Sequence, residues 1–145
     1  MVGVGTLLTA QQVHDAKKSG ATFGVSPGST PSLIAAAEKF DLPLLPGAAT
    51  ASEAMYLLEQ GFLFQKFFPA ETSGGAKALA AFAAPLPQIK FCPTGGLNST
   101  NAGTYLSLPN VVCAGGSWMA PKTLMAKRAW AEITQIARLA ADLRP

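Results

Sequence analysis

Charged residues, histidines and cysteines are all scarce in this sequence. Asp, Glu, Lys and Arg make up 13% of the 145 residues, the net charge is +3, and no basic run resembles a nucleic-acid-binding arm. The single histidine, His14, excludes any triad or metal site that needs several imidazoles, and we expect it on a helix surface. The two cysteines, Cys92 and Cys113, match neither a zinc pattern nor a disulfide scaffold, so we expect buried, reduced thiols.

Long apolar stretches are missing as well. No segment reaches the length that spans a bilayer, and the start MVGVGTLLTAQQ lacks the basic and apolar regions of a signal peptide. We therefore expect a cytoplasmic protein that binds neither membranes nor nucleic acids. A hydrophobic content of 49% is enough for one substantial core, which predicts a single domain over residues 1–145.

What the sequence does have is a regular alternation of strand-like and helix-like segments. The strand-like runs are VGVG, TFGVS, LPLLPG, FLFQKFF, IKFCP and NVVCAGG, and a helix-compatible stretch follows each one. We expect the helices to begin at Thr9, at Ser29 or Thr30, at Thr50, and at Asn98 or Ser99, with Gly20 and Gly61 just past two helix ends. Six strand–helix units of this kind predict an α/β fold with parallel strands.

Glycine, proline or small polar residues follow each strand-like run, which favours a (β/α)8 TIM-type barrel over other α/β folds. In such barrels the functional site lies at the carboxyl ends of the strands. A Rossmann domain is disfavoured because GVGTLLT lacks the glycine pattern of a dinucleotide-binding loop.

Lys66 is the candidate catalytic residue, because it lies in the middle of the aromatic segment FLFQKFF. A two-residue period places Phe64, Lys66 and Phe68 on one face of the strand and Gln65 and Phe67 on the other. Burial beside aromatic rings disfavours the charged ammonium and leaves a neutral amine able to attack a carbonyl. From this strand alone, a lysine that reaches the barrel mouth or pairs with Glu71 remains an alternative.

Two glycine clusters follow the last two strand-like runs. They contain Gly95 and Gly96 after Thr94, and Gly115 and Gly116 before Ser117. Glycines let backbone N–H groups approach an anion closely, and barrels often bind phosphate in the loops after their last strands. Together with Lys66, these clusters predict a substrate with a ketone at one end and a phosphate at the other.

The segments FGVSPG, PLLPGAAT, FQKFFPAE, KFCPTGG and CAGGSWMAP together resemble the 2-keto-3-deoxy-6-phosphogluconate aldolase family, and the resemblance extends from about residue 2 to the final helix. It implies a class I aldolase of the Entner–Doudoroff pathway. Such an enzyme cleaves 2-keto-3-deoxy-6-phosphogluconate to pyruvate and glyceraldehyde 3-phosphate through a lysine Schiff base, and many members also accept 2-keto-4-hydroxyglutarate. It further implies a homotrimer that needs no metal or other cofactor.

The resemblance also implies roles for individual residues. Lys66 matches the Schiff-base lysine and Phe68 an aromatic wall of the pyruvate pocket. The remaining matches are Thr6, Pro27 and Thr94 at the keto-acid end and Gly95, Gly96, Gly116 and Ser117 at the phosphate.

One motif of the family is absent from this sequence. Members carry a glutamate that moves protons and an arginine that holds the carboxylate, in a motif resembling EVTLR after their second strand, and the chain opens at what looks like the third. We expect Glu132 to be solvated on a helix. We expect Glu71 to have a helix-start or rim role and not to replace the missing base. We also expect open edges at residues 2–5 and 111–114.

We interpret Met1 as a false or internal start, or the chain as a gene fragment or deliberate truncation with little aldolase activity alone. Two alternatives remain open. One is an aldolase that acts on the galactonate epimer or decarboxylates oxaloacetate. The other is a non-catalytic fragment that binds sugar phosphates or needs a separate N-terminal piece.

Overall fold

The computed structural model describes residues 1–143, in which short strands alternate with helices. In chain order the elements are β1 (Gly3–Gly5), α1 (Ala10–Lys18), β2 (Phe23–Val25), α2 (Pro31–Lys39), β3 (Leu44–Leu45), β4 (Gly47–Ala48), α3 (Ala51–Glu59), β5 (Phe64–Phe67), α4 (Gly75–Phe82), β6 (Lys90–Pro93), α5 (Ala102–Leu106), the 3₁₀ helix η1 (Ser117–Met119), α6 (Lys122–Ala126) and α7 (Trp130–Ala141). The predicted α/β class is confirmed.

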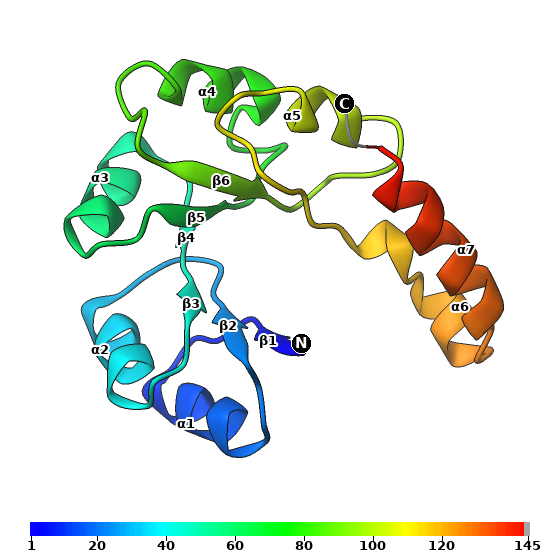
Figure 1. Ribbon diagram of the computed structural model, residues 1–145, viewed down its shortest axis with the longest axis horizontal. Helices are drawn as coiled ribbons and strands as arrows, with labels where there is room; N and C mark the ends of the chain where they lie inside the picture. Colours follow the sequence, from blue (N-terminus) through cyan, green and yellow to red (C-terminus); the bar gives the residue numbers. More distant parts are fainter. Residues whose placement is uncertain (144–145) are drawn as a thin grey trace.

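All paired strands are parallel and lie side by side in chain order. One sheet has the order β1-β2-β3 and the other β4-β5-β6. Helices α1 to α5 lie on the outer side of the strands, whereas α6 and α7 project away from them (Figure 1). This arrangement leaves the inner side of the strands open in the part of the chain that the structure describes.

The predicted strand LPLLPG is divided in two at Pro46. Leu45 pairs with β2, whereas Gly47 pairs with Lys66 of β5. Pro46 has no N–H to donate, but its carbonyl accepts a hydrogen bond of 2.8 Å from the Lys66 N–H. The chain thus changes partners at Pro46, which joins the two sheets edge to edge.

The predicted last strand, NVVCAGG, is not a regular strand. It pairs with β6 only through isolated parallel bridges, Phe91–Val111 and Thr94–Gly115. Two residues of β6, 92–93, lie opposite three residues, 112–114, as in a β-bulge. Within residues 1–143, this segment and β1 each pair on one side only, in agreement with the predicted open edges.

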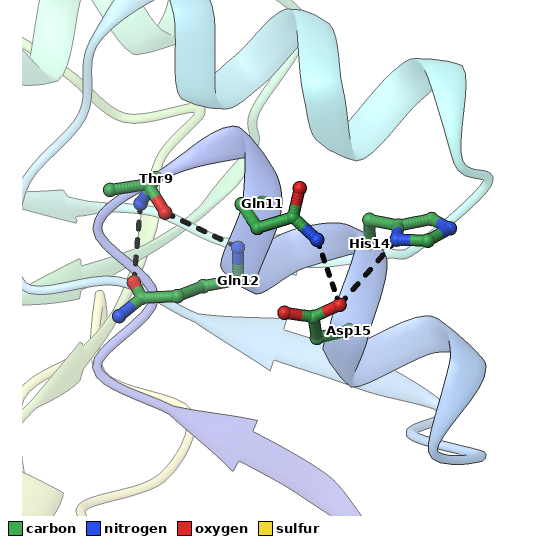
Figure 2. Close-up of polar contacts among 5 residues, drawn as sticks. All are labelled: Thr9, Gln11, Gln12, His14 and Asp15. Atoms are coloured by element: carbon green, nitrogen blue, oxygen red, sulfur yellow. Dashed lines mark hydrogen bonds and ion pairs between the residues drawn. The ribbon is translucent and has the colours of Figure 1, made fainter.

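The helix starts follow the predicted caps with one exception. Thr9, Thr30 and Thr50 each accept a hydrogen bond at the start of a helix, and Figure 2 shows the reciprocal pair formed by Thr9 and Gln12. Gly20 and Gly61 follow the last residues of two helices with φ angles of 88° and 87°, as predicted. The prediction of Asn98 or Ser99 as a cap is wrong, because α5 begins later.

Asn98 instead closes a turn in front of α5. Its side-chain oxygen accepts hydrogen bonds from the N–H groups of Thr100 and Asn101, at 2.9 and 3.2 Å. Asn101 is the residue that precedes the helix. An asparagine oxygen that binds its neighbours' N–H groups favours a turn over continued helix, which delays the helix start.

The buried apolar side chains form two clusters. One lies between the first sheet and helices α1 and α2. The larger one lies between the second sheet and helices α3, α4 and α5. Ile34 of α2 packs against the second cluster and so connects the two. Helix α7 has no fully buried residue, and no helix within residues 1–143 is long and apolar enough to cross a membrane.

Candidate active site

Lys66 lies on the face of β5 that points away from the helices. Gln65 and Phe67 are fully buried on the opposite face, where Gln65 donates hydrogen bonds of 3.0 Å to the carbonyls of Ala54 and Phe62. Phe64, on the same face as Lys66, is 57% exposed. The predicted alternation along this strand is confirmed.

Lys66 is half-buried and forms no ion pair within residues 1–143. Its Nζ lies 4.4 Å from the centre of the Phe68 ring, and Cys92 is its partner in the register of β6. Burial lowers the pKa of the Lys66 ammonium, and this effect outweighs a smaller, opposite electrostatic effect of Cys92. Because no ion pair joins Lys66 to Glu71 within residues 1–143, that alternative is not what the structure adopts, and burial shifts the equilibrium of Lys66 toward the neutral amine.

The ends of the first strands lie near the level of Lys66. Gly47 pairs with Lys66, and a Cβ added at Gly47 would lie 2.2 Å from the carbonyl oxygen of Pro27. Thr6 directly follows β1, where its φ of 64° is a left-handed conformation that threonine rarely adopts. Backbone strain of this kind costs roughly 1–3 kcal/mol and is concentrated at functional sites. The parallel register thus brings Thr6, Pro27 and Lys66 to the same end of the strands.

The two glycine clusters lie side by side just beyond Lys66. Thr94 and Gly115 are bridged, so the residues that follow them leave neighbouring positions at the same end of the strands. Gly95 and Gly96 have φ angles of 95° and 84°, a left-handed pair that only glycine adopts easily. Phe68 is two residues beyond Lys66, roughly 7 Å along the strand.

Four backbone N–H groups of the two clusters lack partners within residues 1–143, whereas the N–H of Gly115 donates to the carbonyl of Pro93 at 3.0 Å. Within residues 1–143, no protein acceptor receives a hydrogen bond from the N–H of Gly95, Gly96, Gly116 or Ser117. The Gly116 backbone lies under the Trp118 ring, since an added Cβ would meet that ring at 1.8 Å. Unpaired N–H groups on glycine backbone are the donors that bind phosphate in many proteins.

The prediction of two buried thiols is wrong for Cys113. Cys92 is partly buried, but Cys113 is exposed. The bulge at residues 112–114 displaces the regular alternation of faces, which is why the apolar run did not reveal this exposure. A hydrogen bond between the two thiols lowers the pKa of Cys113 to about 7 and, with burial, raises that of Cys92.

The other candidate side chains lie apart from Lys66. Glu132 is exposed on α7, as predicted, and Glu71 accepts a hydrogen bond from the hydroxyl of Tyr105. His14 is partly exposed on α1, where it lies beside Asp15 (Figure 2), and its ring centre is 4.8 Å from that of Phe40. Among residues 1–143 no group of three or more His, Cys, Asp or Glu side chains could hold a metal ion.

Sequence reasoning overlooked two neighbours of the site. Cys92 lies beside Lys66, and the alternation of KFCP, with Phe91 and Pro93 buried, is the signal that could have placed it on the same face. Tyr105 contacts Glu71 from a helix 34 residues further along the chain, and no local pattern indicates that contact. Lys66 lies on an open face and lines none of four surface pockets of about 290 to 570 Å³ formed by residues 1–143.

Comparison with known proteins identifies the family. Residues 1–136 match the family model described as KDPG and KHG aldolase. The chain is 45% identical over 141 residues to a 2-dehydro-3-deoxy-phosphogluconate aldolase of Pseudomonas aeruginosa, an alignment that covers 97% of this chain and 64% of the relative. The chain thus spans slightly less than two thirds of that relative's length.

Two solved structures share the fold closely. A KDPG aldolase from Legionella pneumophila, solved with pyruvate captured as a covalent carbinolamine intermediate, is 46% identical with a TM-score of 0.92. A 2-keto-3-deoxy-6-phosphogluconate aldolase of Zymomonas mobilis, solved with 3-phosphoglycerate, is 42% identical, also with a TM-score of 0.92. They cover 95% and 99% of this chain, which covers 67% of each. The chain therefore belongs to the KDPG and KHG aldolase family.

Proposed function

We propose that this chain carries the lysine chemistry of an aldolase that reversibly cleaves 2-keto-3-deoxy-6-phosphogluconate to pyruvate and glyceraldehyde 3-phosphate. The observation that carries the proposal is the half-buried Lys66, which forms no ion pair within residues 1–143 and whose pKa is lowered by burial. It lies at the end of the strands where two glycine loops carry N–H groups that donate to no acceptor in the same residues. Family membership and the carbinolamine captured in the Legionella pneumophila aldolase support it.

The reaction begins at the ketone. The neutral amine of Lys66 attacks C2 to give a carbinolamine, and loss of water gives a protonated imine. A base removes the proton of the C4 hydroxyl, the bond between C3 and C4 breaks, and its electron pair passes into the iminium to form an enamine. The aldehyde leaves, C3 is protonated, and water releases pyruvate from Lys66.

The surrounding residues hold the two ends of the substrate. Phe68 covers one side of the amine, and Thr6, Pro27 and Thr94 line the keto-acid end. Gly95, Gly96, Gly116 and Ser117 bind the phosphate through their backbone N–H groups. The 3-phosphoglycerate bound to the Zymomonas mobilis relative supports a site for a phosphorylated acid.

The base for the C4 hydroxyl is not assigned. Within residues 1–143 no carboxylate pairs with Lys66, and Glu71 is occupied by Tyr105. Imine formation and full cleavage are therefore separate properties of this chain, to be measured separately.

Borohydride trapping tests the imine. Reduction in the presence of pyruvate should leave an adduct on Lys66, found by peptide mass mapping. Lys90 is the matched control, because it too lies in a strand but donates a hydrogen bond of 2.9 Å to the carbonyl of Pro109. Lys66→Met should abolish the adduct and Lys90→Met should retain it. Folded protein without an adduct on Lys66 would contradict the proposal.

Assays of pyruvate release test the cleavage and its substrate. Release from 2-keto-3-deoxy-6-phosphogluconate, its galactonate epimer and 2-keto-4-hydroxyglutarate should be compared, with oxaloacetate as a decarboxylation substrate. An adduct on Lys66 without any turnover would favour the fragment that needs a separate piece to supply the base.

We also propose that residues 1–145 form one domain whose parallel strands are six of the eight of a TIM-type barrel. The packing of Ile34, on helix α2, against the second cluster and the greater length of the relatives support this. A homotrimer and a cytoplasmic location remain predictions, which gel filtration with light scattering and cell fractionation would test.

A further inference from the structure

Glu71 and Tyr105 form a polar contact behind the first glycine loop. Tyr105 is 1% exposed and its hydroxyl donates to the Glu71 carboxylate, while Glu71 itself reaches solvent. Burial and this hydrogen bond raise the pKa of Tyr105, so its hydroxyl stays protonated and able to donate.

Glu71 in turn lies directly against the loop. Its backbone N–H donates to the carbonyl of Gly95 at 3.1 Å, and the preceding N–H of Ala70 donates to Thr94 at 2.8 Å. A Cβ added at Gly96 would meet the Cγ and Cβ of Glu71 at 2.6 and 2.8 Å. The Glu71 side chain therefore packs directly against Gly96, in the space that a side chain at this position would need.

The far side of the loop is closed by Asn101. Its side-chain N–H donates to the carbonyl of Gly96 at 3.2 Å, and its side-chain oxygen accepts from the N–H of Asn98 at 2.8 Å. The carbonyls of Gly95 and Gly96 are thus both bound, while their N–H groups donate to no protein acceptor within residues 1–143. Hydrogen bonds to its carbonyl oxygens thus hold the loop in place, while its N–H groups remain available to a ligand.

We propose that Tyr105 is a positioning residue for phosphate recognition: by binding Glu71 it holds the Gly95–Gly96 loop in the conformation whose N–H groups bind the phosphate of the substrate. This inference rests on the proposed function, because it assumes that the loop binds phosphate. Tyr105 itself contacts no substrate and acts through Glu71. Donors held in place bind an anion more tightly, because no conformational freedom is lost on binding.

The first test removes one oxygen atom. Tyr105→Phe should weaken the binding of 3-phosphoglycerate, measured by calorimetry, by about fivefold to tenfold, a part of what a hydrogen bond to a charged group contributes. Borohydride trapping of pyruvate on Lys66 should be unchanged, because no hydrogen bond or ion pair joins Lys66 to Tyr105 or Glu71 within residues 1–143. Tyr56→Phe is the matched control, since no hydrogen bond of the Tyr56 hydroxyl is present within residues 1–143, and it should alter neither measurement.

The second test compares two variants of Glu71 that have the same net charge. Glu71→Gln and Glu71→Ala both remove the carboxylate, but only glutamine keeps a side-chain oxygen that can accept from Tyr105. The Glu71→Gln variant should bind 3-phosphoglycerate about fivefold more tightly than the Glu71→Ala variant, and adding Tyr105→Phe to both should remove that difference. Hydrogen exchange of the Ala70 and Glu71 amides should be faster in Tyr105→Phe, because these N–H groups donate to the loop.

Three outcomes would overturn the proposal. One is a Tyr105→Phe variant that binds 3-phosphoglycerate as tightly as the parent. Another is an equal loss of pyruvate trapping, which would indicate general damage and not positioning. The third is a parent chain that binds no 3-phosphoglycerate, which would overturn both the phosphate site and the role of Tyr105. Borohydride trapping would then still test whether Lys66 forms an imine.

Discussion

Replacing Gly47 by alanine should strongly lower the stability of the fold, because Gly47 lies where the two sheets meet. An alanine Cβ there would be 2.2 Å from the carbonyl oxygen of Pro27, 2.3 Å from its carbon and 2.7 Å from the N of Gly28. Favourable contact needs roughly 3.5 Å. All three atoms belong to backbone, so no side chain can rotate away, and the strands themselves must separate.

The expected cost of Gly47→Ala is about 3 kcal/mol in the free energy of unfolding, the upper end for overpacked sites. The hydrogen bonds from Lys66 to Pro46 and from Phe68 to Ala48 flank Gly47 and would be strained by the same shift. With a urea m value of about 2 kcal/mol per M, the unfolding midpoint should fall by about 1.5 M.

Urea unfolding followed by circular dichroism measures this shift. Gly28→Ala is the matched control, because a Cβ there meets no atom within 4 Å, and its effect should stay within about 0.5 kcal/mol. A midpoint for Gly47→Ala close to that of the parent, at an unchanged m value, would refute the claim that the strands are in rigid contact at this point. Equal losses in both variants would refute it too.

Three further perturbations test other parts of the structure. Phe67→Ala should cost about 3–5 kcal/mol in urea unfolding, because Phe67 is fully buried at the centre of the larger cluster. The pKa of Glu53 is lowered, mainly by a hydrogen bond from the N–H of Ala49, so its stabilising contribution is present above its unfolded pKa and is lost as pH falls through the folded value. Glu53→Gln should therefore flatten the acid side of a stability–pH curve, and an unchanged curve would count against it. Alkylation of Cys113 by iodoacetamide should rise near pH 7 and shift to higher pH in Cys92→Ala, as read by mass spectrometry across pH.

Features set by neighbouring residues were predictable from the sequence. The threonine caps, the glycines past two helix ends and the opposite facing of Gln65 and Lys66 were all predicted and are all present. Each depends on hydrogen bonds or side-chain directions within a few residues, which local spacing specifies directly.

Features that depend on strand pairing were not predictable. The change of partner at Pro46 and the bulge at residues 112–114 arise from how neighbouring strands align, and the bulge is what exposes Cys113. The late start of α5 was also missed, because two asparagine side chains compete with the backbone for its hydrogen bonds.

The features of the candidate site also fall into those set by local sequence and those set by tertiary contacts. The sequence by itself determined that a lysine lies on an aromatic strand and that glycine pairs end the last two strands, because period and residue type are local properties. Only the tertiary structure decided that Cys92 lies beside Lys66, that the loop N–H groups are free, and that Tyr105 holds Glu71. These are contacts between segments distant in the chain, and they exist only once the parallel register brings the strand ends together.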